Sequence, residues 1–352
     1  MLTSINFYSI CAACYVFALF IYVLNLGFNR EWVRRIATTL SAFGFLTQTL
    51  GMAIRWFESG LVELNAYQLA TGTKIVNKSA LYWKIVTQHP PWSNLYEIII
   101  YMSWGMVFVF LVCEIKWKPR FLNVFSLLLA VTALGISSLT DSTIKPLVPA
   151  LKSWWIMLHV VSASVAYSAG TLGAMSSFLY VLKNKDRIPI SKIVLYTILA
   201  IVGSFGIILI NGTVTKWNLS LTGFLFAILI FVILTYFFPV KIRSLIPSLE
   251  QLDHIAYTNI LISFILMAIV LVTGALWAHY AWGRYWGWDP KETGALVIWI
   301  TYAMYLHTRL TRNWVGTKSA IIGILGFFII IAGFLGVNLG WFANGLHSYG
   351  NS

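Results

Sequence analysis

The chain has 352 residues, of which 59% are hydrophobic and only 10% are charged, and its formal net charge is +13. Soluble domains carry roughly 25% charged residues, so a chain of this composition does not cover itself with a polar surface. This excludes a large soluble protein.

Ten apolar runs bounded by charged residues are candidate membrane-spanning helices. They are mostly about 18 residues or longer, enough to cross a hydrocarbon layer of roughly 30 Å. They are continuous rather than alternating, which excludes a β-barrel and predicts an all-α, polytopic helical bundle. In chain order they lie near residues 5–27, 36–54, 94–115, 121–140, 154–182, 193–210, 221–240, 255–276, 294–310 and 319–341.

We interpret residues 1–352 as a single integral membrane domain. The first run lacks a basic leader and a small-residue cleavage site, so we expect it to remain as a helix. The sixth and seventh runs form a possible additional helical hairpin at 193–240, which leaves the direction of the later helices unchanged.

Basic residues are concentrated in alternate connections between these runs. Fifteen of the 24 lysines and arginines lie in five short clusters, near 30–35, 116–120, 183–192, 241–243 and 309–318. The positive-inside rule predicts that these clusters are cytoplasmic and suited to the anionic headgroups of a lipid bilayer. Because the charge is divided among membrane loops, nucleic-acid binding is not expected. Both termini would then lie on the outer (periplasmic) side, with the loops 55–93, 141–153, 211–220 and 277–293.

The outer segment 277–293 combines aromatic rings with glycines and an acidic ending. Four tryptophans and two tyrosines occur within these 17 residues. An interfacial aromatic belt explains two or three such residues at a helix end. It does not explain interleaved glycines followed by Asp-Pro-Lys-Glu. Flat rings separated by glycines predict a shelf for a large planar apolar ligand such as a porphyrin, with Arg284 or Lys291 meeting its carboxylates.

Two histidines are expected on the same side as this segment. His159 begins the run 154–182, and His347 follows the last run. Neutral imidazole is a good axial ligand for haem iron. We therefore interpret this pair as haem ligands rather than as packing residues.

A third histidine lies deeper in the membrane. His307 is 13 residues beyond Gly294, which is roughly 20 Å along a helix. It is either a haem ligand near the cytoplasmic side, with Arg309 close enough to meet a propionate, or part of a lipid-facing inner boundary. The residues alone leave both interpretations open.

The segment 282–292, Trp-Gly-Arg-Tyr-Trp-Gly-Trp-Asp-Pro-Lys-Glu, resembles the WWD signature of haem-handling proteins. Its ending, together with Tyr-Leu-His-Thr-Arg at 305–309, resembles the CcsA (ResC) type, the membrane subunit of the System II cytochrome c synthase. Each match is modest, but the ordered set is specific. Further stretches resemble the same family in the same order, at 93–97, 154–160, 252–257 and 336–350.

The resemblance implies a role in cytochrome c biogenesis, as a holocytochrome c synthase subunit of the haem lyase type. Haem b would cross from the cytoplasmic side and be presented outside at the Cys-x-x-Cys-His motif of an apocytochrome c. The external catalytic residues implied are Trp282, Trp286, Trp288 and Asp289. The haem-binding residues implied are His159 and His347 as external iron ligands, His307 as the transmembrane ligand, Arg284 and Arg309.

The resemblance also implies partners and a location. A CcsB (ResB) type membrane subunit would supply a second transmembrane histidine, and thioredoxin-like proteins would keep the apocytochrome thiols reduced. The membrane would be the bacterial inner membrane, or the thylakoid membrane in plastid relatives.

Other functions remain open alternatives. A haem transporter, or a WWD protein that loads a chaperone without ligase activity, would use the same aromatic segment. A transporter for an unrelated solute predicts polar residues converging near mid-bilayer, and few are found. A purely structural assembly protein leaves the ordered histidines unexplained.

Overall fold

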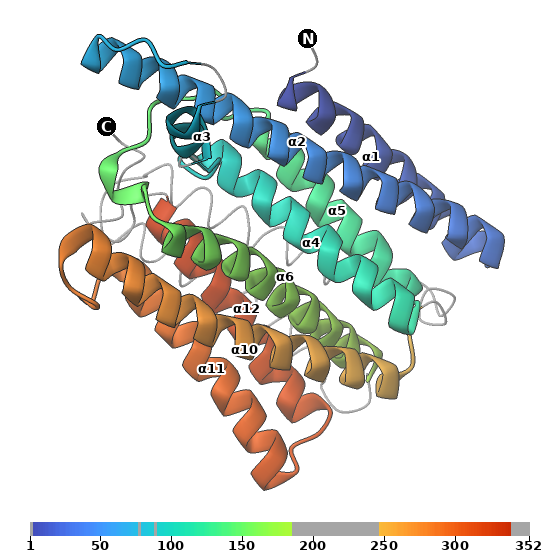
Figure 1. Ribbon diagram of the computed structural model, residues 1–352. Helices are drawn as coiled ribbons and strands as arrows, with labels where there is room; N and C mark the ends of the chain where they lie inside the picture. Colours follow the sequence, from blue (N-terminus) through green and yellow to red (C-terminus); the bar gives the residue numbers. More distant parts are fainter. Residues whose placement is uncertain (1–2, 77–78, 88–89, 185–245, 339–352) are drawn as a thin grey trace, which may run out of the picture.

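The computed structural model describes residues 3–76, 79–87, 90–184 and 246–338, and within these ranges every regular element is a helix. This confirms the predicted all-α class. The predicted hairpin at 193–240 lies outside the described residues. The elements are α1 (Ser4–Phe28), α2 (Glu31–Thr71), α3 (Ala80–Thr87), α4 (Leu95–Trp117), α5 (Arg120–Ser137), η1 (Pro149–Leu151), α6 (Trp154–Lys183), α10 (Leu249–Trp282), α11 (Pro290–Arg312) and α12 (Thr317–Asn338) (Figure 1).

Four of the described helices are long and apolar enough to cross a membrane by length and composition: α1, α4, α6 and α10. The other predicted runs lie largely in helices where they are described, namely α2, α5, α11 and α12, whose apolar parts are shorter or interrupted by polar residues. The total of ten spans stays a prediction.

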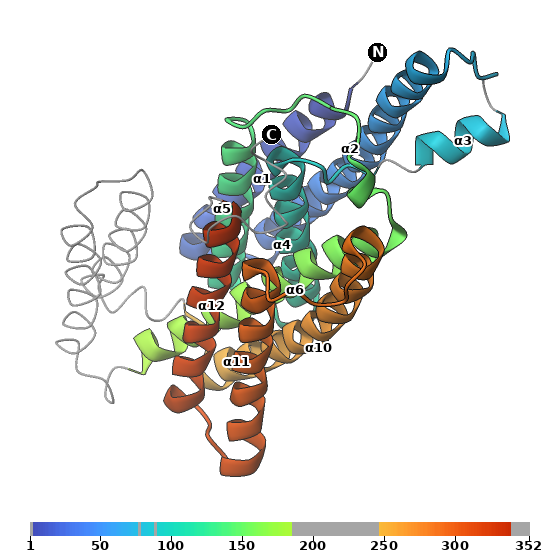
Figure 2. The same ribbon diagram turned by 90° about the vertical axis from the view of Figure 1, so that its left-hand side faces the viewer.

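The prediction that residues 55–93 form a loop is wrong in part, because α2 continues to Thr71 and α3 follows it. The apolar run ends at Arg55, but the helix continues because Arg55 is buried and pairs with Glu97 on α4. Further along, α3 crosses α2 so closely that a Cβ added to Gly60 would lie 2.7 Å from the Val86 Cα. Figure 2 shows α3 beside the end of α2 that projects from the bundle.

The central helix is α6, which packs along α10 and also contacts α4, α5 and α12. It joins α1, α2, α4 and α5 on one side to α10, α11 and α12 on the other (Figures 1 and 2). Small side chains allow this close packing. A Cβ on Gly173 of α6, for example, would lie 2.8 Å from the Ile260 side chain of α10.

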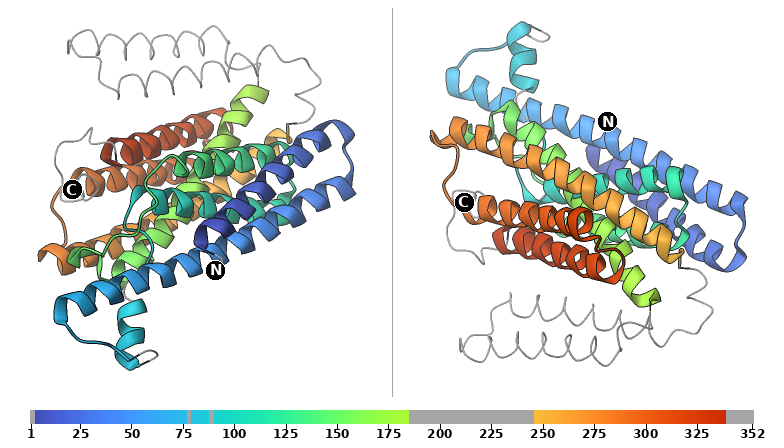
Figure 3. Two further views of the ribbon diagram at one scale, coloured as in Figure 1. Left: turned by 90° about the horizontal axis from the view of Figure 1, so that it is seen from above. Right: turned by 90° about the horizontal axis from the view of Figure 1, so that it is seen from below.

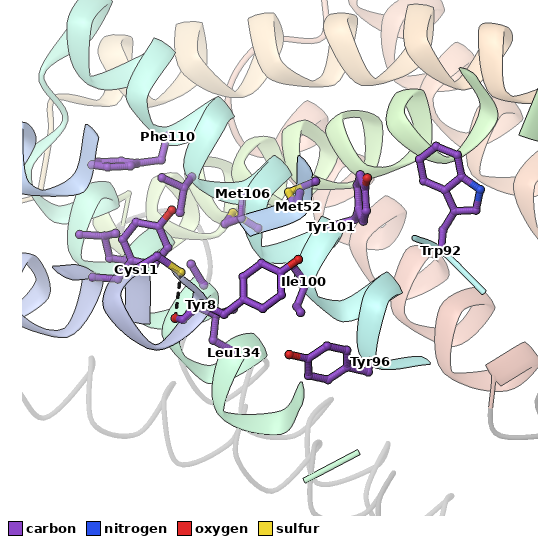
Figure 4. Close-up of a cluster of buried hydrophobic side chains, with 14 of the residues drawn as sticks. Tyr8, Cys11, Met52, Trp92, Tyr96, Ile100, Tyr101, Met106, Phe110 and Leu134 are labelled. Atoms are coloured by element: carbon purple, nitrogen blue, oxygen red, sulfur yellow. Dashed lines mark hydrogen bonds between the residues drawn. The ribbon is translucent and has the colours of Figure 1, made fainter. Parts of the chain in front are cut away.

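Aromatic and polar side chains fill the contact between α1, α2 and α4, as Figure 4 shows for Tyr8 and Tyr96. Their rings meet edge to face with centroids 6.3 Å apart. Deeper in the contact, the Tyr15 hydroxyl donates to Gln48 Oε1 at 2.8 Å, and Gln48 Nε2 donates to the Ile100 carbonyl at 3.1 Å. The buried Tyr15 and Gln48 side chains are therefore both hydrogen-bonded, as burial requires.

Successive helices run in alternate directions, so their ends meet in two groups. Gln251 at the start of α10 donates to the Trp117 carbonyl at the end of α4, at 2.7 Å. Asn184, after α6, donates to Thr317 at the start of α12, at 3.0 Å. These contacts gather the described basic connections predicted to be cytoplasmic at one end of the bundle. Viewed from below, α11 and α12 lie on the side opposite α2 (Figure 3).

Candidate functional site

Two neighbouring hollows lie at the opposite end, where residues 283–289 join α10 to α11. The first is bounded by α6, α10, this connection and α11, and we call it the aromatic hollow. The second is bounded by α4, α6, α11 and α12. The side chains that line both are His159, Tyr167, Lys291 and Ala295. The imidazole of His159 and the ammonium group of Lys291 therefore lie where the two hollows meet.

His159 projects from the first turns of α6 onto α10. Its Nδ1 lies 2.9 Å from the carbonyl oxygen of Val270. A carbonyl oxygen only accepts hydrogen bonds, so Nδ1 carries the proton. In the neutral ring Nε2 is then an unprotonated nitrogen with a free lone pair. The ring lines both hollows, so this nitrogen is available as a ligand for a metal.

One tryptophan near the end of α10, Trp277, lines the aromatic hollow. Trp277 is buried, and its Nε1 donates to the Ala150 carbonyl at 2.8 Å. Its ring lies 6.5 Å from the His159 ring at an interplanar angle of 31°, and 4.8 Å from the Trp282 ring. Helix α10 ends at Trp282 because Gly283 takes the left-handed conformation, φ +72°, that glycine adopts without strain.

The aromatic rings of the connection between α10 and α11 differ in their exposure and in the residues they contact. Tyr285 stacks on His279 with centroids 4.2 Å apart. Trp286 lines the hollow, and its buried Nε1 has no hydrogen-bond partner among the described residues. Trp288 is 71% exposed and touches Trp286 edge to face. Arg284 is exposed, lies against Gly287 and lines neither hollow.

The Asp-Pro-Lys-Glu sequence begins α11. Asp289 is the N-cap, and its Oδ1 accepts from the Lys291 N–H at 3.0 Å. The Glu292 Oε2 accepts from the backbone N–H groups of Gly287 and Asp289, at 2.8 and 3.2 Å. Asp followed by Pro, with Glu three residues after Asp, is the sequence pattern of a capping box. The sequence could therefore have revealed this structural role, while the catalytic role of Asp289 stays a prediction.

Lys291 follows directly from this cap. Its exposed surface faces the two hollows, and it makes no ion pair with any described residue. Desolvation by the surrounding protein lowers the pKa of its ammonium group, and the neighbouring Asp289 carboxylate opposes that shift. The hollow thus contains a cation suited to an anionic group of a ligand.

We expect Glu292→Ala to lower the free energy of unfolding by about 1–2 kcal/mol, because two backbone N–H groups lose their acceptor. Thermal unfolding in detergent measures the effect. Glu292→Gln keeps an acceptor oxygen and should retain most of the stability. Glu250→Ala is the matched control, since Glu250 also lies in the first turn of a helix but is exposed. Equal losses for Glu292→Ala and Glu250→Ala would contradict the capping role.

The predicted deep residues lie apart from this site. His307 is exposed on the face of α11 that also carries Ile300 and Met304, and it lines neither hollow. It is 16 residues beyond Lys291, or roughly 24 Å along the helix. The structure therefore separates His307 from the hollows.

Arg309, near the end of α11 that is remote from the hollows, is already paired with another residue. Its Nη1 donates to Asp253 Oδ1 at 2.8 Å, and its Nη2 also pairs with the same carboxylate. Its guanidinium lies 4.9 Å from the centre of the Tyr257 ring. An incoming carboxylate would have to compete with Asp253. Neither this carboxylate nor the Tyr257 ring could be assigned from the sequence, because Asp253 and Tyr257 lie 56 and 52 residues before Arg309.

Of the predicted external pair, the structure brings His159 beside the aromatic segment, and His347 lies outside the described residues. Sequence reasoning missed Val270, Gly274 and Tyr167, which also line the aromatic hollow. No local pattern marks them, since their role depends on how α6 packs on α10.

Comparison with known proteins gives one consistent result. The sequence model of the family described as Cytochrome C assembly protein matches residues 92–344. A protein named Cytochrome c biogenesis protein CcsA from Pyropia yezoensis is 32% identical over 340 residues, covering 95% of this chain and 93% of the relative. The protein of the same name from Prochlorococcus marinus (strain NATL1A) is 33% identical over 331 residues, covering 90% and 94%.

A solved structure described as Cytochrome c Heme Lyase CcmF resembles the fold with a TM-score of 0.55 at 13% sequence identity. The likeness covers 96% of this chain but 49% of the CcmF chain, so this chain spans about half the length of that protein. At this identity the likeness concerns the fold alone.

Proposed function

The chain belongs to the cytochrome c assembly protein family as a CcsA-type cytochrome c biogenesis protein, and from this premise we propose that it binds haem in the aromatic hollow and presents it for attachment to apocytochrome c. The observation that carries the proposal is the meeting of three groups in one hollow. These are an imidazole whose Nε2 accepts no hydrogen bond from the described residues, an ammonium group that makes no ion pair with them, and a wall of indole and phenol rings.

His159 supplies the iron ligand in this proposal. The Val270 carbonyl fixes the proton on Nδ1 and so reserves Nε2 for the iron. A hydrogen bond on the second ring nitrogen orients a metal-binding histidine and makes it more basic. His347 would bind the opposite face of the iron, as the family resemblance implies.

The rest of the hollow suits a porphyrin. Trp277, Tyr285 and Trp286 offer flat apolar surfaces to the ring. The Lys291 ammonium is placed to meet a propionate, and Arg284 is available at the exposed rim. Trp282 acts through Trp277, against which it packs, and Trp288 offers an exposed ring to an arriving polypeptide.

The proposed chemistry is addition of thiols to alkenes. Haem b carries two vinyl groups, and each cysteine thiol of a Cys-x-x-Cys-His motif adds across one of them. A carbon–sulfur bond forms and the thiol proton passes to the other vinyl carbon, so the step needs no oxidant. The protein's part is to hold the haem edge toward the apocytochrome, whose own histidine then replaces one of the protein's ligands.

The passage of haem to this site is part of the proposal. Haem would approach from the cytoplasmic side by way of His307, with a CcsB (ResB) type subunit supplying a second histidine. The exposed position of His307 supports a contact with a lipid-facing ligand or a partner helix. Arg309 would have to exchange Asp253 for a propionate in such a step, and thioredoxin-like proteins would keep the apocytochrome thiols reduced.

An absorption spectrum tests the proposal. The protein, purified with its partner subunit from haem-replete cells, should show a Soret band of low-spin, bis-histidine haem. A colourless preparation would refute haem binding. Haem binding without conversion of an added reduced apocytochrome would favour the alternative of a haem transporter or chaperone-loading protein.

A further inference from the structure

Two residues of α10, Val270 and Gly274, lie against the His159 ring. The Val270 carbonyl accepts the ring's Nδ1–H at 2.9 Å. One turn later, Gly274 leaves the surface of α10 bare where the ring lies: a Cβ at this position would be 2.9 Å from His159 Cε1 and 3.0 Å from Nδ1. Real Cβ atoms are essentially never found this close, so the ring occupies space that any other residue at 274 would fill.

We propose that Gly274 is a positioning residue that holds His159 in the orientation and tautomer required for binding haem iron. The inference rests on the proposed function, because it concerns the ligand of the same site. A side chain at 274 would push the ring off the Val270 carbonyl. The ring would then lose the hydrogen bond that keeps the proton on Nδ1, and Nε2 would no longer be held for the iron.

The close packing of α6 on α10 limits how far the ring can move toward its own helix. α6 and α10 pack closely along their length, and their contact already includes tight approaches such as Gly173 against Ile260. The space left to the ring is the hollow itself, which is the space the ligand needs. A methyl group at 274 therefore acts on the ligand through His159 rather than by contact of its own.

The experiment compares Gly274→Ala with Gly173→Ala in the full chain purified with its partner subunit. Both variants add a methyl group to the same α6–α10 contact at similar spacing, but only position 274 faces His159. Gly274→Ala should lower the ratio of low-spin haem to folded protein by about tenfold, as disruption of a metal ligand's supporting contact does. Gly173→Ala should leave that ratio within about twofold, whatever its effect on stability. A wild-type spectrum for Gly274→Ala overturns the proposal.

A second comparison separates positioning from packing. In His159→Gly, free imidazole should restore the low-spin band, and adding Gly274→Ala should leave the restored band unchanged, because an untethered imidazole can shift away from the methyl group. An equal loss with and without the His159 side chain would show that Gly274 acts through packing alone. Low-spin haem in His159→Gly without imidazole would instead refute His159 as ligand, and with it the proposed function of this residue.

Discussion

Replacement of His159 by glycine is expected to abolish both the low-spin haem spectrum and the maturation of c-type cytochromes. His159 is the one histidine among the described residues that line the aromatic hollow, and its Nδ1 is already committed to the Val270 carbonyl. Loss of the ring therefore removes the proposed iron ligand and leaves an opening beside Gly274.

That opening makes the prediction specific. Free imidazole should enter it and restore part of both signals, which it cannot do if His159 serves only to pack α6 against α10. The measurements are the Soret spectrum of the purified complex and the yield of covalently attached haem in cells. His254→Gly is the matched control, since His254 is exposed at the opposite end of the bundle against Trp117. Full activity of His159→Gly without imidazole would contradict the assignment.

The helices that the sequence predicts most closely are those whose apolar runs end beside charged residues that are not buried. The runs at 5–27, 94–115 and 154–182 agree with α1, α4 and α6 to within about two residues, the usual margin for helix ends. The end of α2 was missed because Arg55 is charged but buried against Glu97. A hydropathy profile scores every charged residue as if it faced water. A buried charge that is paired inside the protein is therefore mistaken for the end of a helix.

The candidate site likewise contains residues that the sequence could identify and a contact that it could not. The roles proposed for the aromatic segment and His159 depend on the side chain itself, so residue type and topology were enough to nominate them as candidates. The capping box formed by Asp289 and Glu292 was also readable, because its pattern is local. The contact of His159 with Gly274 was not, since it joins residues 115 positions apart and depends on the register between α6 and α10.

The ion pair of Arg55 and Glu97 should be the most sensitive position in the described fold. The side chains are 3% and 2% exposed, with Arg55 Nε and Glu97 Oε1 3.0 Å apart. Each side chain makes a further hydrogen bond: Arg55 Nη2 donates to the Ser142 carbonyl at 2.6 Å, and Glu97 Oε2 accepts from the Ser93 N–H at 2.8 Å. Removing one partner leaves the other charge buried and unpaired.

Glu97→Ala and Arg55→Ala should each lower the free energy of unfolding by about 3–5 kcal/mol. The double variant Arg55→Met with Glu97→Leu should lose less than either, because two apolar side chains of similar volume replace the pair without leaving a charge. Denaturant unfolding in detergent, followed by tryptophan fluorescence, measures these losses. Arg35→Ala should cost no more than about 0.5 kcal/mol, because the Arg35–Glu31 pair is largely exposed. A double variant less stable than both single variants would contradict the prediction.

This pair also decides how the stretch 93–97 is interpreted. The stretch is one of those that resemble the family, yet its glutamate is bonded to α2 and to the start of its own helix and lines neither hollow. Loss of Glu97 should therefore reduce cytochrome maturation by lowering the amount of folded protein, while each folded molecule keeps its haem spectrum. Loss of His159 should do the reverse, leaving folded protein without low-spin haem. Measuring haem per folded molecule for the two variants separates residues that build the bundle from those that bind its ligand.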